Sequence, residues 1–345
     1  VPLASHILLT ALSVTMKPSC LHGLDKYISE PHRQLCYSLV NEWIHSEDDD
    51  KLYEIARVVE ERHNLERLFD SLELSDLMNS ECFPCINECI LRRYMSEISD
   101  SIIKAEDIMS AVEKRRTLKW YKRVRYYFDG LLQVALMQQF YQNNSESFYI
   151  AEYSTFWKEY TGKFYKMDYF YRQFHTSFGK SLKESTTVLE DLYKNVADYV
   201  ENLYKNWFLS SLEKQWMSLI KEPMSKFSEL VGIPQQSNFY RDCVKPIASS
   251  GSRVYVIISD ALRYEVAAEL ADKLIKETKG TAKISAVQSV FPSATKFGMA
   301  ALLPHKELQL TDDMKVLCDG ERTDSTADRE KILKAESSGN VALTY

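Results

Sequence analysis

Apolar residues recur at helical spacing through the first two thirds of the chain. Within residues 51–69 they fall mostly three, four or six positions apart, at Leu52, Ile55, Val59, Leu65, Leu68 and Phe69. Such spacing places them on one face of an amphipathic helix. Residues 32–44, 117–141 and 186–220 follow the same rhythm without a fixed-period repeat, which argues against a solenoid. The pattern predicts a helical domain over 1–231.

Helix-breaking residues then interrupt this rhythm. Gly232, Pro234, Pro246 and the Ser/Gly cluster at 249–252 stop any continuous helix. We therefore expect a linker over 232–252 and a second domain over 253–345.

Beyond the linker, short apolar runs alternate with segments of helical periodicity. The expected strands are 254–259, 282–290, 314–320 and 340–345, and the expected helices are 262–277, 296–303 and 326–336. Continuously apolar strands that alternate with helices are typical of a parallel sheet covered on both faces. The predicted fold class is a mostly α helical array followed by the first part of an α/β parallel-sheet domain.

Composition narrows the class of protein. The 345 residues are 27% charged and 45% hydrophobic, as in globular proteins, and the formal net charge of −6 argues against a general nucleic-acid or membrane surface. No apolar run reaches the roughly 18 residues that span a bilayer. Seven cysteines, an odd number, suit a reducing cytoplasm. The first residues lack an initiator Met and a basic signal region, so we expect the chain to begin inside a longer protein.

Two polar residues stand where the second domain could carry chemistry. Asp260 ends the apolar run 254–259, and ligands of parallel sheets bind at the carboxyl ends of strands. Thr295 begins a helical pattern, where free N–H groups favour an oxyanion. Each residue also suits a helix N-cap, and this alternative stays open. A threonine hydroxyl needs a metal or a base beside it to act as a nucleophile, and Asp260 could hold that metal.

The segments around these residues resemble a known family. "VYVIISDALRYEVAAEL", "FPSATKFGMAALLPH", "VLCDGERTDSTADREKIL" and "VALTY" closely resemble the PglZ domain, a branch of the alkaline phosphatase superfamily, over residues 253–345. "EKRRTLKWYKRVRYYFDGLLQVALMQQF" and "YTGKFYKMDYFYRQF" resemble the region that precedes this domain in the PglZ proteins of BREX phage-defence systems. The resemblance implies a cytoplasmic, metal-dependent phosphatase or phosphodiesterase/nuclease of a BREX-type phage-resistance system. The alternative is a scaffold subunit of the defence complex without turnover of its own.

The resemblance also implies roles for individual residues. Asp260 would bind a divalent metal, and Thr295 would be the nucleophile and a further metal ligand, with two zinc ions in the complete domain. Ser293 is a second candidate hydroxyl. Arg263 would contact the substrate phosphate, although an arginine there also suits a pair with a nearby carboxylate. The implied partners are other BREX proteins such as the methyltransferase subunit, with nucleic acid as a further candidate and no membrane.

The rest of the implied metal site is not found in this sequence. After Thr295 the chain contains one histidine, His305, at the far end of the helical pattern, and no Asp-His pair. One aspartate and one threonine cannot complete the coordination of two divalent ions. We therefore expect the chain to be truncated at both ends, with the remaining ligands beyond it. The isolated chain is expected to bind zinc weakly and to show no turnover.

Three further motifs have structural interpretations. Cys82, Cys85 and Cys89 show the spacing of a metal or redox site, but no second C-x-x-C follows, and buried thiols on a helix are favoured. The basic segment 114–125 could track a phosphate backbone, although a helix that packs its apolar residues inward is favoured. The acidic residues at 46–51 are expected in a solvated loop.

Overall fold

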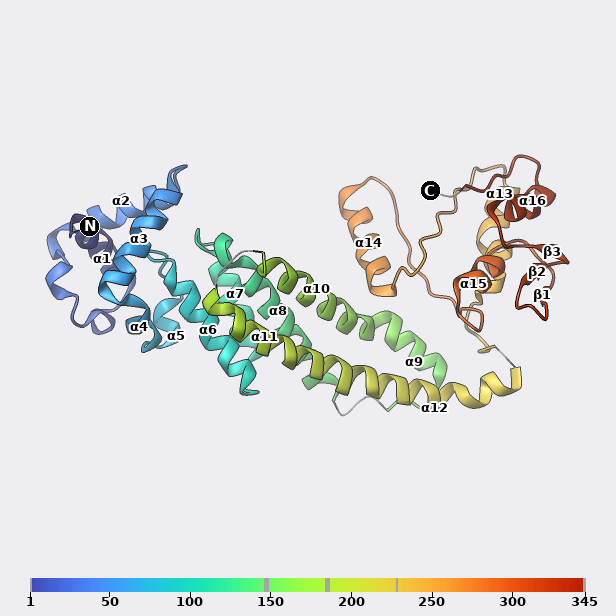
Figure 1. The fold of residues 1–345 in the computed structure, drawn as a ribbon, viewed down its shortest axis with the longest axis horizontal. Helices are drawn as coiled ribbons and strands as arrows, with labels where there is room; N and C mark the ends of the chain where they lie inside the picture. Colours follow the sequence, from blue (N-terminus) through green and yellow to red (C-terminus); the bar gives the residue numbers. More distant parts are fainter. Residues whose placement is uncertain (1, 146–148, 184–186, 228, 344–345) are drawn as a thin grey trace. The chain divides into compact units, whose positions relative to one another are not determined.

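A computed structural model describes residues 2–145, 149–183, 187–227 and 229–343. The helical array predicted for the first part of the chain is confirmed (Figure 1). The chain forms two compact units, Val1–Phe148 with Lys166–Leu212, and Tyr149–Tyr165 with Glu213–Tyr345. These units divide the chain elsewhere than at the expected boundary near residue 232. No helix in the described part of the chain is long and apolar enough to cross a membrane.

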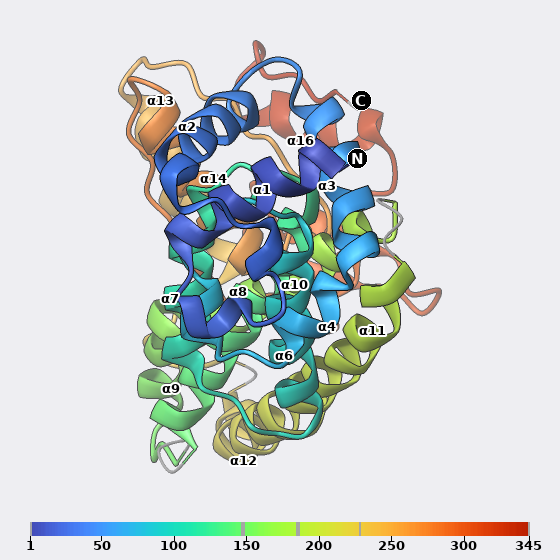
Figure 2. The same cartoon turned by 90° about the vertical axis from the view of Figure 1, so that its left-hand side faces the viewer.

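The first unit is built from helices alone among its described residues. Helices α1, α2 and α3 pack against one another at its N-terminal end (Figure 2). Helix α6 lies at its centre, with Ile86, Ile90 and Met95 fully buried, and contacts α4, α8 and α11. The elements are α1 (Pro2–Thr15), α2 (Arg33–Ile44), α3 (Asp49–His63), α4 (Leu65–Asp70), α5 (Leu74–Leu77), α6 (Cys85–Ser99), α7 (Ala105–Arg116), α8 (Tyr121–Asn144), α10 (Tyr165–Ser181), α11 (Thr187–Glu201) and the π-helix η5 (Asn202–Leu209).

The side chain of Tyr193 in α11 reaches α8 at Gly130. The buried ring of Tyr193 lies over this glycine, and its hydroxyl donates a hydrogen bond to the carbonyl of Tyr126 at 3.2 Å. A Cβ atom added at Gly130 would lie 1.6 Å from the Tyr193 oxygen. The absence of a side chain at position 130 therefore leaves room for the Tyr193 side chain against α8.

We expect Gly130→Ala to destabilise the first unit. The added methyl group forces Tyr193 to move, and overpacking of this kind costs about 1–3 kcal/mol, which exceeds the gain in helix propensity of about 1 kcal/mol. Gly179→Ala in α10 is the matched control, because nothing lies within 4 Å of its added Cβ. Denaturant unfolding of both variants checks the prediction, and equal midpoints for the two would contradict it.

A buried carboxylate anchors the start of α6. Glu60 of α3 is 5% exposed, and its Oε1 accepts the backbone N–H of Cys85 at 2.8 Å. Its Oε2 lies 2.9 Å from Nη1 of Arg57, which also binds Glu88. Burial raises the pKa of Glu60 to about 7, although the Cys85 N–H and Arg57 favour the charged form. At neutral pH this carboxyl is therefore part protonated in the folded protein.

The raised pKa predicts that unfolding free energy falls as pH rises. The unfolded carboxyl titrates near 4.5 and the folded one near 7. The stabilisation of the protonated form is therefore fully present below the unfolded pKa and is lost as pH rises through 7. We expect wild type to lose about 2–3 kcal/mol relative to Glu60→Gln between pH 4.5 and 8. Urea unfolding of both proteins across this range measures the difference, and parallel curves would contradict the assignment.

The second unit contains α9, η4, most of α12, the described helices that follow α12, and all the paired strands found in the described residues. Its elements are α9 (Tyr153–Glu159), the π-helix η4 (Tyr160–Phe164), α12 (Ser210–Phe227), η6 (Gln236–Asn238), the π-helix η7 (Tyr240–Val244), α13 (Lys245–Ser249), α14 (Tyr264–Glu277), α15 (Thr295–Ala301), β1 (Leu308–Leu310), β2 (Val316–Cys318), β3 (Glu321–Arg322) and α16 (Thr326–Glu336). Trp216 of α12 packs on Phe156 of α9 with ring centroids 5.4 Å apart. This contact explains why α12 groups with the second unit from Glu213 onward.

The segment 232–252 differs from the expected linker. Gly232 and Pro234 do separate it from α12, but η6, η7 and α13 lie within it. Its glutamines also form hydrogen bonds with residues 288–290, described below. Glycine and proline in a sequence indicate where a helix ends. They do not indicate whether the following segment is held by contacts with other parts of the chain.

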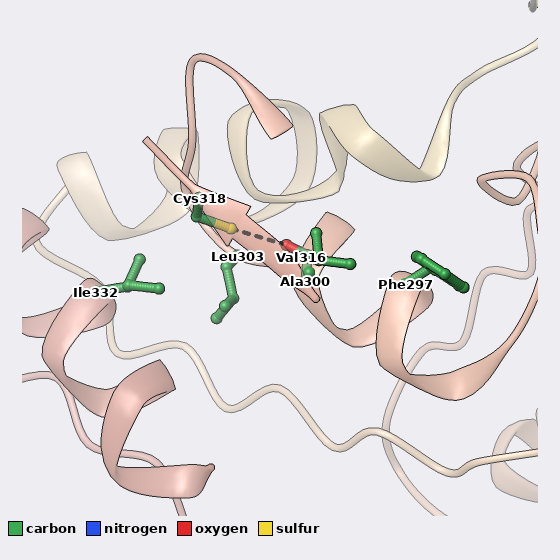
Figure 3. Packing of buried hydrophobic residues seen from close by; sticks show 6 residues of the cluster. All are labelled: Phe297, Ala300, Leu303, Val316, Cys318 and Ile332. Carbon is green, nitrogen blue, oxygen red and sulfur yellow. Dashed lines mark hydrogen bonds between the residues drawn. The ribbon is translucent and has the colours of Figure 1, made fainter. Parts of the chain in front are cut away.

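A small hydrophobic core organises the C-terminal part of the second unit. Figure 3 shows Phe297, Ala300 and Leu303 from the α15 region facing Val316 and Cys318 of β2, with Ile332 of α16 nearby. The Cys318 thiol donates to the Ala300 carbonyl at 3.5 Å. Strands β1, β2 and β3 form an antiparallel sheet in that order. The turn from β2 to β3 is Asp319-Gly320, with φ of 49° and 84°, the combination that two-residue hairpins favour.

The structure confirms the expected helices of this unit but only part of its expected strands. The helices over 262–277, 296–303 and 326–336 are confirmed as α14, α15 and α16, and 314–320 contains β2. Residues 254–259 are extended but unpaired, with Ile257 91% exposed, and 282–290 makes one isolated parallel bridge, Gln235 to Gln288. The last expected strand includes 344–345, which are outside the described residues. Parallel pairing among the described residues is therefore limited to that bridge. The expected parallel sheet is not found there, because the apolar pattern of a segment does not specify which other segment will pair with it.

Candidate functional site

Asp260 follows the apolar segment 254–259 and lies four residues before Tyr264, the first residue of α14. Its side chain is exposed, and its Oδ1 accepts the backbone N–H of Ala261 at 3.0 Å. Ala261 has φ of 58°, in the left-handed region that residues with a Cβ rarely adopt. The backbone therefore reverses immediately after Asp260, so that the carboxylate lies at a turn.

The structure brings Thr295 to this carboxylate. The Thr295 hydroxyl donates a hydrogen bond to Oδ2 of Asp260 at 3.0 Å, across 35 residues of sequence. Both side chains are exposed, so water and a ligand can reach the pair. Donation of its proton to Oδ2 directs the lone pairs of the Thr295 oxygen away from the carboxylate, an orientation compatible with nucleophilic attack.

Neither residue is a helix N-cap, the alternative that the sequence left open. The N-cap of α14 is Arg263 and that of α15 is Ala294, and neither makes a side-chain capping bond. Thr295 is the first residue of α15, a helix of seven residues, which is too short for its dipole alone to define an anion site. The Asp260–Thr295 contact thus joins two turns and is not part of helix capping.

Arg263 is placed by a buried glutamate. Its guanidinium Nε lies 3.1 Å from Oε1 of Glu265, whose side chain is 1% exposed, while that of Arg263 is 51% exposed. The pair with a nearby carboxylate, one of the two alternatives for Arg263, is therefore present. The Arg263 side chain is half exposed, and its contact with a phosphate stays a prediction. No role for Glu265 follows from the sequence alone.

Three other residues near α15 have defined positions. Ser293, the second candidate hydroxyl, is exposed in the turn before α15. Lys296, which the sequence did not single out, donates from Nζ to the carbonyl of Met314 at 3.0 Å. His305 lies beyond the C-terminal end of α15, and its Nδ1 donates to the carbonyl of Leu303 at 2.7 Å. Of these, only Ser293 presents an oxygen in the turn that precedes Thr295.

A groove of about 740 Å³ lies beside this turn but does not include the polar pair. Apolar residues line much of it, among them Met217 and Met224 of α12 with Phe291 and Phe297. Neither Asp260 nor Thr295 lines it. The described residues therefore leave the pair open to solvent and separate from the neighbouring groove.

The metal-binding capacity of the described residues is limited. No group of three His, Cys, Asp or Glu side chains among them lies close enough to hold a metal ion. Cys82, Cys85 and Cys89 are free and buried, as favoured from the sequence, and burial raises the pKa of all three thiols. Carboxylate and hydroxyl oxygens suit hard divalent cations, so Asp260 and Thr295 fit as two ligands of a larger set.

The basic segment 114–125 meets the acidic segment 46–51. Lys119 lies 3.3 Å from Asp49, and Arg123 forms an ion pair with Asp50. Trp120 and Phe128 are buried, in agreement with the packed-helix interpretation. Asp49 begins α3, so the acidic residues are only partly in the expected loop. Opposite charges in these two runs were visible in the sequence, but nothing in it indicated that they would pair.

Comparisons with known proteins agree with the resemblance of the second unit. A family model described as the BREX system PglZ alkaline phosphatase-like domain matches residues 239–345. The alkaline phosphatase-like protein PglZ of Bacillus cereus (strain H3081.97) is 30% identical over 343 residues, 98% of this chain and 39% of that protein. The alkaline phosphatase-like protein BrxZ of Escherichia coli O9:H4 (strain HS) is 32% identical over 269 residues, 75% of this chain and 31% of that protein. The chain thus spans less than half the length of these relatives. No solved structure matches it.

Proposed function

The chain belongs to the PglZ family of alkaline phosphatase-like proteins of BREX systems, and on this premise we propose that it supplies part of a metal-dependent phosphoryl-ester hydrolase. In this proposal Asp260 binds a divalent cation, Thr295 attacks the phosphorus atom, and Arg263 contacts the phosphate. Phosphomonoesters and phosphodiesters, including nucleic acid, are the candidate substrates. The alkaline phosphatase-like description of the family supports a hydrolase, and the contact between Asp260 and Thr295 supports the position of its site.

The contact between Asp260 and Thr295 is the observation that carries the proposal. Two exposed polar residues that are remote in sequence meet at 3.0 Å, and neither caps a helix. An exposed hydroxyl–carboxylate pair between two turns contributes little to stability, since water competes for both groups. A role in binding or chemistry accounts for the arrangement better than a role in folding.

The two residues fit a metal as a partial ligand set. A divalent cation on the Asp260 carboxylate would favour the deprotonated nucleophile and neutralise charge on the phosphoryl oxygens. Asp260 would hold this cation through its oxygens, and Oδ2 would orient the Thr295 hydroxyl until a solvent water takes its proton. We propose zinc as the metal and two ions in the complete site, which requires ligands in addition to those described here.

Glu265 and Arg263 suit phosphate recognition in this scheme. The buried carboxylate of Glu265 pairs with Nε of Arg263, and a guanidinium can bind phosphate oxygens in a forked geometry. The proposed partners are other BREX proteins, such as the methyltransferase subunit, and the proposed location is the cytoplasm.

A scaffold function is the second candidate, and one observation favours it. Because the described residues contain no cluster of three metal-ligating side chains, they do not by themselves form a hydrolytic metal centre. A protein that binds BREX partners tightly without bound metal would agree with the scaffold.

Metal titration of the intact protein separates the two candidates. We expect Asp260→Asn to weaken zinc binding at least about tenfold, because an uncharged amide is a poorer ligand than a carboxylate. Asp313→Asn is the matched control, since Asp313 is also exposed and also accepts a bond from a threonine hydroxyl, that of Thr311 at 2.5 Å. Isothermal titration with zinc measures both. Unchanged zinc affinity in Asp260→Asn would remove Asp260 from the metal site.

A further inference from the structure

Three glutamine side chains connect the segment after α12 to the chain that leads into Thr295. The backbone N–H of Gln236 donates to the carbonyl of Gln288 at 2.9 Å, and that of Gln288 donates to Pro234 at 2.7 Å. Oε1 of Gln288 accepts the N–H of Leu230 at 2.8 Å and Nε2 of Gln235 at 3.1 Å. We call Gln235, Gln236 and Gln288 the glutamine clamp. It fixes residues 288–290 against 230–236.

Within the clamp, Gln236 contacts both sides of the turn that precedes Thr295. Its Oε1 accepts the backbone N–H of Val290, before the turn, at 3.1 Å. Its Nε2 lies 3.2 Å from the position that a Cβ would take at Gly298, one helical turn after Thr295. The carboxamide therefore lies against the backbone of α15, and η6 packs on this helix. One side chain thus spans the turn 291–294.

The opposite side of α15 is held by the hydrophobic core. Phe297 and Ala300 are buried in the cluster with Val316 (Figure 3). The helix is therefore fixed between this core and the Gln236 carboxamide. Because Thr295 is its first residue, the position of the hydroxyl relative to Asp260 depends on both contacts. The turn itself is exposed from Phe291 to Lys296 and supplies little packing of its own.

We infer that Gln236 is a positioning residue for Thr295. Its carboxamide holds Val290 and α15 in one geometry and thereby keeps the Thr295 hydroxyl within hydrogen-bonding distance of Asp260. Gly298 is part of the same device, because its lack of a side chain leaves room for the carboxamide. The geometric claim stands on these contacts alone, whereas its consequence for catalysis rests on the proposed function.

Hydrogen exchange of the intact protein tests the geometric claim without reference to activity. We expect Gln236→Ala to increase exchange about tenfold at the amides of Val290, Phe297 and Gly298. The Val290 N–H loses its acceptor, and opening of the first turn of α15 no longer requires breaking the carboxamide contacts. Gln236→Glu keeps the acceptor for Val290 and should restore protection, whereas Gln236→Asn is too short and should not. Gln309→Met is the control, since Gln309 is an exposed glutamine that bonds Glu307. Unchanged exchange in Gln236→Ala would overturn the inference.

Turnover of an aryl phosphate tests the catalytic consequence. We expect Gln236→Ala to lower kcat about tenfold or more with KM changed less than about threefold, since a displaced nucleophile still permits substrate binding. Gly298→Ala should lower kcat in the wild type, because the added methyl group displaces the Gln236 carboxamide. The same substitution should have little further effect in Gln236→Ala, which has no carboxamide at this place. Increased exchange with unchanged kcat would overturn the positioning role. If the wild type shows no hydrolysis, the proposed function fails, while the exchange result still decides whether Gln236 holds the turn.

Discussion

Thr295→Ala should abolish phosphate-ester hydrolysis by the intact protein while leaving its unfolding transition almost unchanged. The substitution removes the only oxygen that the proposed mechanism uses for attack, and loss of a nucleophile typically lowers kcat by about 10³-fold or more. Because the hydroxyl is exposed and donates to an exposed carboxylate, its loss costs little stability. Aryl phosphate turnover and a thermal melt of the same sample measure the two effects.

The chain offers a matched control for this variant. Thr311 also donates its hydroxyl to an exposed aspartate of the second unit, Asp313. Thr311→Ala should therefore keep wild-type turnover, and Thr295→Ser, which restores a hydroxyl, should recover part of it. Full turnover in Thr295→Ala would sink the nucleophile assignment, and comparable losses in Thr295→Ala and Thr311→Ala would show a general effect on the unit.

Arg115→Met should cause a large loss of stability in the first unit. Arg115 is fully buried, and burial lowers its pKa to about 10. Its Nε donates to Oδ1 of Asn87 at 2.8 Å, and its Nη1 donates to the carbonyls of Ser80 at 2.7 Å and Met78 at 3.2 Å. Methionine fills much of the space but leaves these acceptors without a donor. Each unsatisfied buried acceptor costs about 1–3 kcal/mol, and the three acceptors therefore cost about 3–9 kcal/mol. Removal of the buried charge offsets part of this, so we expect a net loss of about 3–5 kcal/mol.

The neighbouring arginine provides the comparison for Arg115. Arg116 is 55% exposed, and its Nη2 lies 3.8 Å from Asp129. Exposed pairs contribute about 0–1 kcal/mol, so Arg116→Met should change the unfolding free energy by less than that. Urea unfolding of the two variants decides the matter. A loss below about 1 kcal/mol in Arg115→Met would mean that removal of a desolvated charge offsets the broken hydrogen bonds.

Arg115 also shows what a sequence pattern conceals. The basic segment 114–125 contains this arginine among other cations, and a charge run on a helix usually indicates a solvated face. In the structure one of these cations is in the core, while Lys119 and Arg123 pair with Asp49 and Asp50. A run of basic residues shows only that a helix is rich in cations. Whether one of them, such as Arg115, is buried depends on the carbonyl groups that neighbouring elements place beside it.

The sequence by itself determined the helical nature of the first unit, the positions of α14, α15 and α16, and the two residues of the candidate site. These features depend on local periodicity, on breaking residues and on motifs, all of which are written in short stretches of chain. The sequence also showed Asp260 and Thr295 at the ends of segments, but left capping as an alternative for both.

Only the tertiary structure decided that Asp260 and Thr295 contact each other, that Gln236 spans the turn before Thr295, and that 254–259 is unpaired among the described residues. Each of these is a contact, or the lack of one, between segments that are distant in sequence. The energy of such contacts depends on distance and geometry in space, and hydrophobic periodicity carries no information about which remote backbone or side chain will lie alongside.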